Sequence, residues 1–143
     1  MHRRLLYLLL IMTAIICVGS YQNRAEAADE YIGTNSYGNE VYLVTESIRE
    51  TMLSHRGYFD GYQYDCRVKC VYPDTREYYT DDYSFICNLG IPYWIKNGVR
   101  ASKNEVSANY QQGGVEWTLL NYFYEYSKQR HPNQWKSEKV LSR

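Results

Sequence analysis

The stretch that decides the fold is 61-GYQYDCRVKCVYP-73. Tyrosine, cysteine and valine occupy its even-numbered positions, and mostly charged or amide side chains stand between them. Successive side chains of a strand point to opposite faces, so this alternation predicts a strand with one buried and one wet face. Helical spacing would scatter the charges through the aromatic residues. We therefore expect 61–73 to form an antiparallel strand at the centre of a sheet.

The N-terminus predicts export. Residues 2–4 are basic, residues 5–18 form an apolar run broken only by Thr13, and Ala25-Glu26-Ala27 has the A-x-A pattern of a cleavage site. These are the three parts of a secretory signal peptide, so we expect residues 1–27 to be removed. A retained membrane anchor is the alternative, but the run is shorter than the roughly 18 to 20 residues that span a bilayer.

The remaining chain is small, weakly acidic and rich in tyrosine. It has 116 residues, with 13 basic and 15 acidic side chains and a net charge of −2. That length suits one small domain, and the lack of a basic excess argues against nucleic acid as a partner. It holds 15 of the 17 tyrosines. Tyrosine is typical of sheets and of wet contact surfaces, so these residues predict either a tyrosine-studded core or a tyrosine-lined binding face.

Strand-like segments flank the central stretch. We expect further strands at 31–34, 40–45, 78–89, 93–96 and 99–101. Asn97-Gly98 suits a type I′ hairpin turn, in which both central residues have positive φ. Segment 47–53 is compatible with a short helix, and the pattern is weak over 102–112.

One helix is predicted near the C-terminus. Val115 to Arg130 has the 3.6-residue period, with Leu119 and Phe123 on its apolar face. Gly113-Gly114 is interpreted as the helix entry, and His131-Pro132 as its end. The fold class is therefore α+β: an antiparallel meander of about five or six strands packed against this helix. We expect one domain over 28–131 and a polar tail over 132–143.

The cysteines allow one internal disulfide. Cys17 leaves with the signal peptide, and Cys66 and Cys70 lie about 13 Å apart on one strand, beyond disulfide reach. If 61–73 and 78–89 pair around a turn near 75–77, opposed residue numbers sum to about 150 to 154. In that register Cys66 faces a residue between about 84 and 88, a window that includes Cys87. We expect any disulfide to be Cys66–Cys87, with Cys70 as a buried free thiol; three small buried core residues are the alternative.

No motif of catalytic or cofactor chemistry is present: there is no G-x-S-x-G, P-loop, dinucleotide fingerprint or H-E-x-x-H. His55 falls in a polar loop and His131 at a helix end. Asp81 and Asp82 are consecutive in a strand, so their side chains point to opposite faces. Three cysteines without a nearby histidine make a poor zinc site. The sequence predicts no catalytic residue, no cofactor and no metal site.

The segment 42-YLVTESIR-49, after a glycine-bearing turn, resembles the opening of small exported bacterial proteins of the surface-adhesin protein E type and their uncharacterised relatives. The resemblance covers about 31–49 of the chain. Thr45 stands where the relatives have aspartate, and Tyr31 where they have tryptophan. The resemblance implies an exported, non-enzymatic protein with a small antiparallel sheet and a helix. No binding residue can be carried over from it.

We therefore expect a small exported, non-catalytic protein of the periplasm, the cell surface or the medium. Its tyrosine-rich sheet face or edge would contact an unknown protein or glycan in the envelope or outside the cell, with no transmembrane segment after signal removal. The alternatives are a periplasmic inhibitor of a hydrolase and a small secreted enzyme. A pocket holding His55 beside Asp60 or Asp65 would favour the enzyme, and a flat aromatic patch of more than a few hundred Å² the binding protein.

Export predicts the mass of the protein recovered from the producing cell. The basic start, apolar run and small-residue exit direct cleavage after Ala27, so intact-mass analysis should find a chain that begins at Ala28. A full-length, membrane-embedded species would contradict this prediction.

Overall fold

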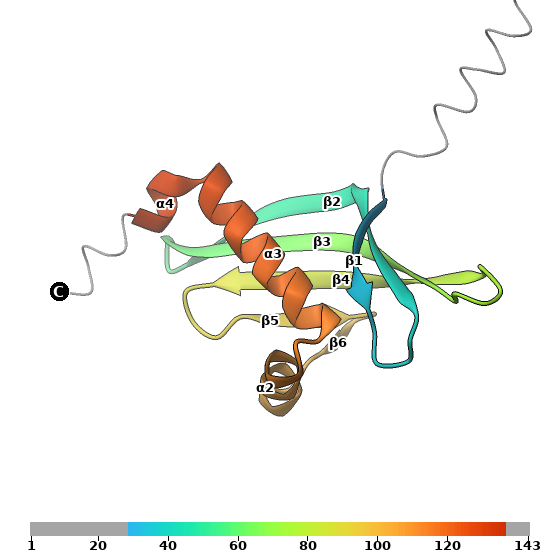
Figure 1. Cartoon of the computed structure of the whole chain (residues 1–143). Coiled ribbons are helices and arrows are strands. Elements are labelled where there is room, and N and C mark those ends of the chain that lie inside the picture. The colour runs from blue at the N-terminus through green and yellow to red at the C-terminus, as the bar shows by residue number, and fades with distance from the viewer. Residues whose placement is uncertain (1–28, 137–143) are drawn as a thin grey trace, which may run out of the picture.

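The computed structural model describes residues 29–136 as a six-stranded antiparallel sheet with helices packed against it (Figure 1). Each strand lies beside the next in sequence, which confirms the predicted α+β meander. The strands are β1 (Asp29–Thr34), β2 (Glu40–His55), β3 (Tyr58–Val71), β4 (Tyr78–Asn88), β5 (Tyr93–Lys96) and β6 (Val99–Arg100). The helices are α2 (Lys103–Gln112), α3 (Val115–Arg130) and α4 (Pro132–Lys136). The predicted signal peptide and the last residues of the predicted tail, 137–143, lie outside the described residues.

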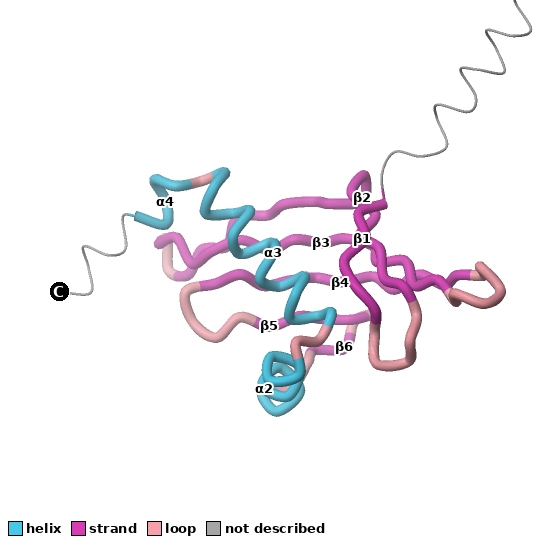
Figure 2. Tube along the Cα trace, in the orientation of Figure 1, coloured by secondary structure: helices cyan, strands magenta, loops and turns pink. Residues whose placement is uncertain are grey.

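β3 lies inside the sheet, between β2 and β4, and has the predicted alternation. Tyr62, Tyr64 and Cys66 are each at most 5% exposed, whereas Gln63 and Asp65 between them are half-buried. Figures 1 and 2 show α3 lying across the strands on one side. The buried positions therefore face the helices. The side of the sheet to which the alternate positions point is called the open face below.

β2 continues as a strand to His55, so the short helix expected over 47–53 does not form. Residues 49–53 pair with 61–65 of β3 and extend the hairpin almost to its turn. Because residues 49–52 are exposed, this pairing with β3 rather than burial is what overrides a local helical tendency.

A wide bulge interrupts β2 between Val44 and Arg49. Residues 45–48 stand opposite the single residue Cys66 of β3. Ser47 stabilises the bulge, because its hydroxyl donates to the Val44 carbonyl (2.6 Å) and accepts from the backbone N–H of β3 residue 67 (2.7 Å). Bulges bend the strand that carries them and increase its twist.

The bend carries β1 toward α3. In Figure 1, β1 and the first part of β2 run steeply across the remaining strands. The hydroxyl of Tyr122 on α3 donates to the Glu30 carboxylate of β1 (3.2 Å), and Ile32 packs against the core. The sheet thereby curls around one side of the helix.

The register between β3 and β4 differs from the predicted one. Cys66 stands opposite Tyr83, and Cys87 stands opposite Tyr62, so opposed residue numbers sum to 149 (66 and 83). The predicted register is wrong because the turn is centred between residues 74 and 75 rather than near 75–77. Cys70 also faces a tyrosine, Tyr79.

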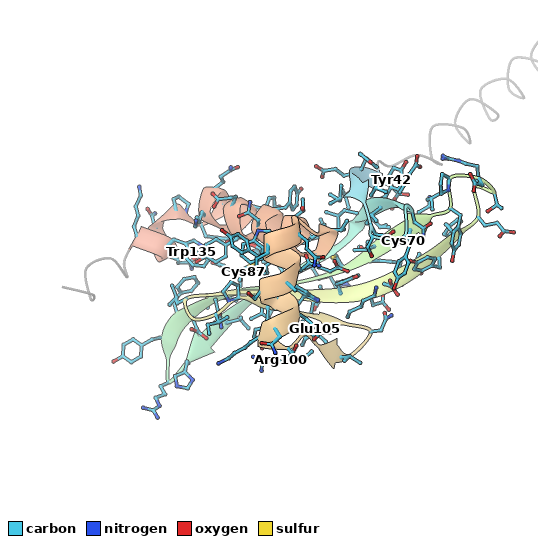
Figure 3. All side chains as sticks on the ribbon, turned by 60° about the horizontal axis from the view of Figure 1, so that its bottom comes forward. Tyr42, Cys70, Cys87, Arg100, Glu105 and Trp135 are labelled. Carbon is cyan, nitrogen blue, oxygen red and sulfur yellow. The ribbon has the colours of Figure 1, made fainter. Side chains whose placement is uncertain are left out.

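As a result, the Cys66–Cys87 bridge expected from the sequence is not formed in the structure, where all three cysteines of residues 29–136 are buried free thiols. Four ladder positions separate Cys66 from Tyr62, the partner of Cys87, which corresponds to about 13 Å along the strand. Figure 3 likewise shows Cys70 and Cys87 far apart along the sheet.

The β5–β6 hairpin forms as predicted. Asn97 and Gly98 have φ values of 48° and 80°, which a type I′ turn requires. The Asn97 side chain also ties the turn to β4, because its amide donates to Asp81 Oδ1 (2.7 Å) and its oxygen accepts from the Asp82 N–H (2.9 Å).

α2 forms where the sequence pattern is weak. The Ser102 hydroxyl accepts from the Glu105 N–H (3.2 Å), and the Glu105 carboxylate accepts from the Ser102 N–H (2.7 Å), which makes a capping box. Gly113 is the C-cap residue of α2, and Gly114 is the N-cap residue of α3, as predicted for the helix entry. Because Val106 is the one buried residue of α2, the helix leaves almost no amphipathic signal in the sequence.

α3 has the predicted bounds and supplies the centre of the core. Leu119, Leu120 and Phe123 are at most 1% exposed. The Phe123 ring stacks on Tyr64 of β3 (4.8 Å between centroids) and packs against Phe85 of β4 (5.3 Å). Aromatic contacts of this kind add stability beyond the area they bury.

Residues 132–136 form α4 instead of the first part of a polar tail. Trp135 is the reason, because its ring lies edge-on to Phe59 (5.4 Å) and packs against Tyr124 of α3 (5.0 Å). Proline is well tolerated in a first helical turn, so Pro132 ends α3 and starts α4.

Truncation of Phe123 should be costly. Phe123→Ala removes the ring between α3 and the sheet, and the free energy of unfolding should fall by about 3 to 5 kcal/mol. Thr118→Ala is the matched control on the exposed side of α3 and should change it by less than about 0.5 kcal/mol. Urea denaturation measures both; equal, small losses would show that α3 does not dock in this way.

Gly61 should not accept a side chain. Its φ is 136°, and a Cβ there would lie 2.1 Å from the Cys87 carbonyl oxygen. Gly61→Ala must therefore separate β3 from β4, and we expect it to lower the free energy of unfolding by about 2 kcal/mol or more. Gly90→Ala is the control, since its nearest neighbour would be at 3.8 Å. Equal melting temperatures of the two variants would contradict the β3–β4 geometry.

Candidate functional site

Helices leave the open face of the sheet uncovered in the described part of the chain. Arg67, Thr80 and Asp82 of the central strands are exposed there, although their sequence neighbours Val68, Asp81 and Tyr83 are buried. The open face is therefore mainly polar along the middle of the sheet. Two features on it could bind a partner.

The first is a hollow of about 500 Å³ between the β2 bulge and β5. Arg49 and Arg67 line it together with Asp65 and Asp82. Arg67 Nε lies 3.3 Å from Asp82 Oδ1, and Asp65 Oδ1 accepts a hydrogen bond from the Ser84 hydroxyl (2.5 Å). The hollow thus presents charges of both signs, of which Arg67 and Asp82 form an ion pair.

The second feature is a row of side chains across β1 to β4, here called the tyrosine row: Tyr31, Tyr42, Lys69 and Tyr78. The rings of Tyr31 and Tyr42 meet edge-on at 5.4 Å, and Lys69 stands opposite Tyr42. The Lys69 ammonium lies 4.8 Å from the Tyr78 ring centroid and 3.0 Å from the Asp29 carboxylate. Tyr31 is 56% exposed and Tyr78 62%.

The ion pairs of the open face contribute little to stability. The side chains of Arg67 and Asp82 are 55% and 76% exposed. Arg76 pairs with Glu40 at 3.0 Å near the tyrosine row, and the Arg76 side chain is 66% exposed and that of Glu40 32%. Exposed pairs of this kind are worth about 0 to 1 kcal/mol each. Their main effect is to hold the side chains in position and to keep the surface close to neutral.

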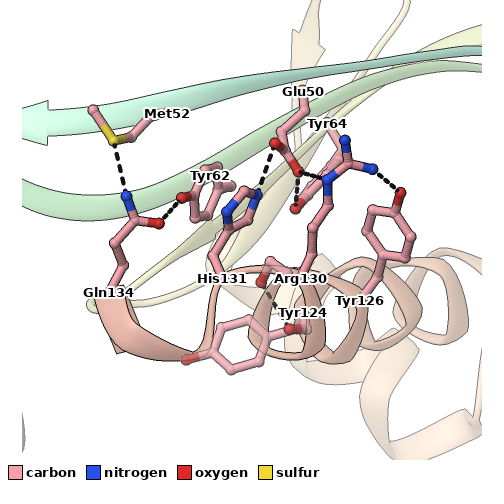
Figure 4. A network of polar contacts seen from close by, with 10 residues as sticks. Glu50, Met52, Tyr62, Tyr64, Tyr124, Tyr126, Arg130, His131 and Gln134 are labelled. Atoms are coloured by element: carbon pink, nitrogen blue, oxygen red, sulfur yellow. Dashed lines mark hydrogen bonds and ion pairs between the residues drawn. The ribbon is translucent and has the colours of Figure 1, made fainter. Parts of the chain in front are cut away.

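A polar network lies on the other side of the sheet, beside α3 (Figure 4). Its centre is the Glu50 carboxylate, which accepts a hydrogen bond from the Tyr64 hydroxyl (2.8 Å) and lies 2.9 Å from His131 Nε2. Arg130 Nε is 4.0 Å from the same carboxylate. The His131 ring stacks on Tyr62 at 4.4 Å.

Gln134 extends this network to α4. Its side-chain oxygen accepts a hydrogen bond from the Tyr62 hydroxyl, and its amide contacts the Met52 sulfur at 3.8 Å. The network therefore joins β2, β3, α3 and α4.

The Cys66 and Cys87 thiols and the Tyr64 phenol of the core are held in their neutral forms. Burial raises the pKa of the Cys66 and Cys87 thiols to about 12, so neither is a thiolate nucleophile at ordinary pH. Burial, and then the hydrogen bond to Glu50, raises the pKa of Tyr64 well above its usual value. Its phenol therefore donates a hydrogen bond and does not act as a base.

The structure separates His55 from Asp65 and Asp81 from Asp82, whereas Asp60 lies at the same end of the β2–β3 hairpin as His55. His55 is exposed at the end of β2, six positions beyond Arg49, the residue opposite Asp65. That offset places His55 and Asp65 about 20 Å apart. Asp81 points to the helix side, where its carboxylate pairs with Lys96 (2.9 Å), whereas Asp82 is on the open face. Asp81 and Asp82 therefore do not form a carboxylate pair.

Sequence reasoning missed the Glu50 network. Glu50 lies in the segment interpreted as a possible helix, and its partners Arg130 and His131 lie 80 and 81 positions later in the chain. His131 itself was singled out only as a surface residue at a helix end. The alternation of β3 predicts that Tyr64 is buried, but no local pattern indicates which carboxylate its hydroxyl meets.

Within residues 29–136, no three His, Cys, Asp or Glu side chains gather as a metal site would need. None of the helices in this range has the length and apolar character required to cross a membrane. Comparison with known proteins gives no further guide, because no family model, curated protein or solved structure matches the chain.

Proposed function

We propose that the protein is a small exported, non-catalytic binding protein that contacts its partner through the open face of the sheet. The partner is a protein or glycan of the cell envelope or the surroundings. The observation that carries this proposal is the tyrosine row, in which Tyr31 and Tyr78 are more than half exposed on a face without a helix.

The chemistry of these side chains suits recognition. Tyrosine combines a rigid apolar ring with a polar tip and is enriched in protein interfaces, where it often contributes much of the binding energy. The Lys69 ammonium and the Asp29 carboxylate form an ion pair at 3.0 Å beside the rings, so the side chains of the row are ordered before a partner binds. Ordering in advance lowers the entropy cost of association.

The remaining groups support binding over catalysis. The cysteine thiols are buried and neutral, and Glu50 is engaged by Tyr64 and His131. A nucleophile or general base needs a suitable pKa and access to substrate. The N-terminal signal pattern supports export, and the near-neutral open face gives no electrostatic reason to bind nucleic acid.

Truncation of the two exposed tyrosines of the tyrosine row should weaken binding to the envelope. We expect the purified protein to be retained on an isolated cell-envelope fraction, and Tyr31→Ala/Tyr78→Ala to reduce the affinity by about tenfold or more, as for interface hot spots. Protease treatment of the fraction distinguishes a protein partner from a glycan.

Tyr110→Ala is the matched control, because Tyr110 is 60% exposed but lies on α2. It should bind like the wild type. Absence of retention, or an equal loss in the control, would contradict binding through the open face.

A further inference from the structure

A second cavity lies on the helix side, between the β2 bulge and α3. It has a volume of about 420 Å³. Ile48, Glu50 and Tyr64 line it from the sheet, and Tyr122, Tyr126 and Arg130 line it from α3. We call it the Glu50 cleft. The tyrosine row and the open-face hollow are on the opposite side of the sheet.

The walls of the Glu50 cleft are aromatic. Tyr122 and Tyr126 lie one helical turn apart with nearly parallel rings, 6.3 Å between centroids and 9° between planes. Tyr64 meets Tyr126 edge-on at 5.8 Å. The faces of such rings carry negative potential and attract cations.

The floor of the cleft adds a carboxylate. The Glu50 side chain is 24% exposed, and so reaches the cavity while the Tyr64 hydroxyl holds its position. A second carboxylate, Glu30, lies behind the aromatic wall and accepts a hydrogen bond from Tyr122. Burial, and then Glu30, raises the pKa of Tyr122, so this phenol is protonated at ordinary pH. The charged groups around the cleft are thus Glu50, Glu30, Arg130 and, when protonated, His131.

The chain already places one guanidinium at this site. Arg130 Nη1 donates to the Tyr126 hydroxyl (2.6 Å), its Cζ lies 5.8 Å from the Tyr126 ring centroid, and its Nε lies 4.0 Å from Glu50 Oε2. Yet the Arg130 side chain is 58% exposed, and its distance to Glu50 exceeds that of a good hydrogen bond. Arg130 thus lines the cleft, but its side chain remains more than half in solvent.

From this geometry we propose that the Glu50 cleft binds the guanidinium group of an arginine side chain, which displaces Arg130 and lies between the tyrosine rings and the Glu50 carboxylate. A free arginine derivative or an arginine of a partner protein offers the same chemistry. The planar cation can hydrogen-bond to the carboxylate and stack on an aromatic face at the same time, which an ammonium does less well. The proposal does not depend on the function of the open face.

Competition with Arg130 gives the proposal a distinctive test. N-acetyl-arginine amide, titrated into isotope-labelled protein purified from the producing cell, should cause saturable NMR shifts at cleft residues. N-acetyl-citrulline amide, the neutral isostere, should cause none. Glu50→Gln should weaken binding by about tenfold, and Tyr122→Leu by a few-fold through loss of the cation–π contact.

Arg130→Gln should have the opposite effect and tighten binding by about threefold or more, because it removes the internal competitor. Lys128→Gln controls for the loss of one positive charge on α3, since Lys128 pairs with Glu125 outside the cleft. It should leave the affinity unchanged. Thermal melts of each variant separate lost binding from lost folding. If Glu50→Gln does not fold, Tyr122→Leu remains as the test of weakened binding.

Several results would overturn the proposal. They are weaker binding by Arg130→Gln, equal tightening by Lys128→Gln, binding of the citrulline derivative, or binding of N-acetyl-glutamate amide in place of the arginine derivative. The last result would show that Arg130 and His131 make the site a receptor for anions. Binding of arginine to the cleft and retention on the envelope fraction are separate measurements, so either proposal can fail without the other.

Discussion

The structure depends on the fit between large and small side chains along the pairing of β3 with β4. Each of the three buried cysteines faces a tyrosine ring across the ladder, so a small side chain always leaves room for a large one. At the centre, Tyr64 faces Phe85, and Phe123 of α3 lies against both rings. Cores tolerate changes that conserve volume and resist those that create cavities or crowding. A two-residue slip that lowered the sum of opposed residue numbers from 149 to 147 would set Tyr62 opposite Phe85 and Tyr64 opposite Tyr83, and would crowd rings against rings beneath α3.

The bulge in β2 creates recesses on both sides of the sheet. Glu46 and Ser47 contribute to the hollow on the open face, while Thr45 and Ile48 contribute to the Glu50 cleft beside α3. Residues 45–48 of β2 stand opposite the single residue Cys66, so they cannot all keep the regular pleat of the strand. They protrude from the plane of the sheet on both sides. One local irregularity thereby provides two recesses of different chemistry, one of mixed charge and one of aromatic rings around a carboxylate.

Features with a local pattern could be predicted from the sequence, and those set by distant contacts could not. The alternation in β3, the Asn97-Gly98 turn and the period of α3 each predict the correct element, because a few neighbouring residues determine it. α2 has no apolar stripe and is specified by its caps, which were overlooked. The β3–β4 register depends on one residue in a turn, and the surroundings of Glu50 depend on the end of α3. The tyrosines fall into two groups by burial: some fill the core, and others are exposed on the open face.

The three buried thiols have a consequence for the path by which the chain reaches its native state. If the protein is exported as proposed, it arrives unfolded in an oxidising compartment, where disulfides form readily. Each of the possible cysteine pairs is absent from the native structure, so any bond formed early joins residues that the sheet must later hold apart. Thiol exchange takes seconds to hours, whereas small domains fold within seconds. Folding must therefore outpace oxidation, and rapid pairing of β3 with β4 would protect the chain by removing its thiols from solvent.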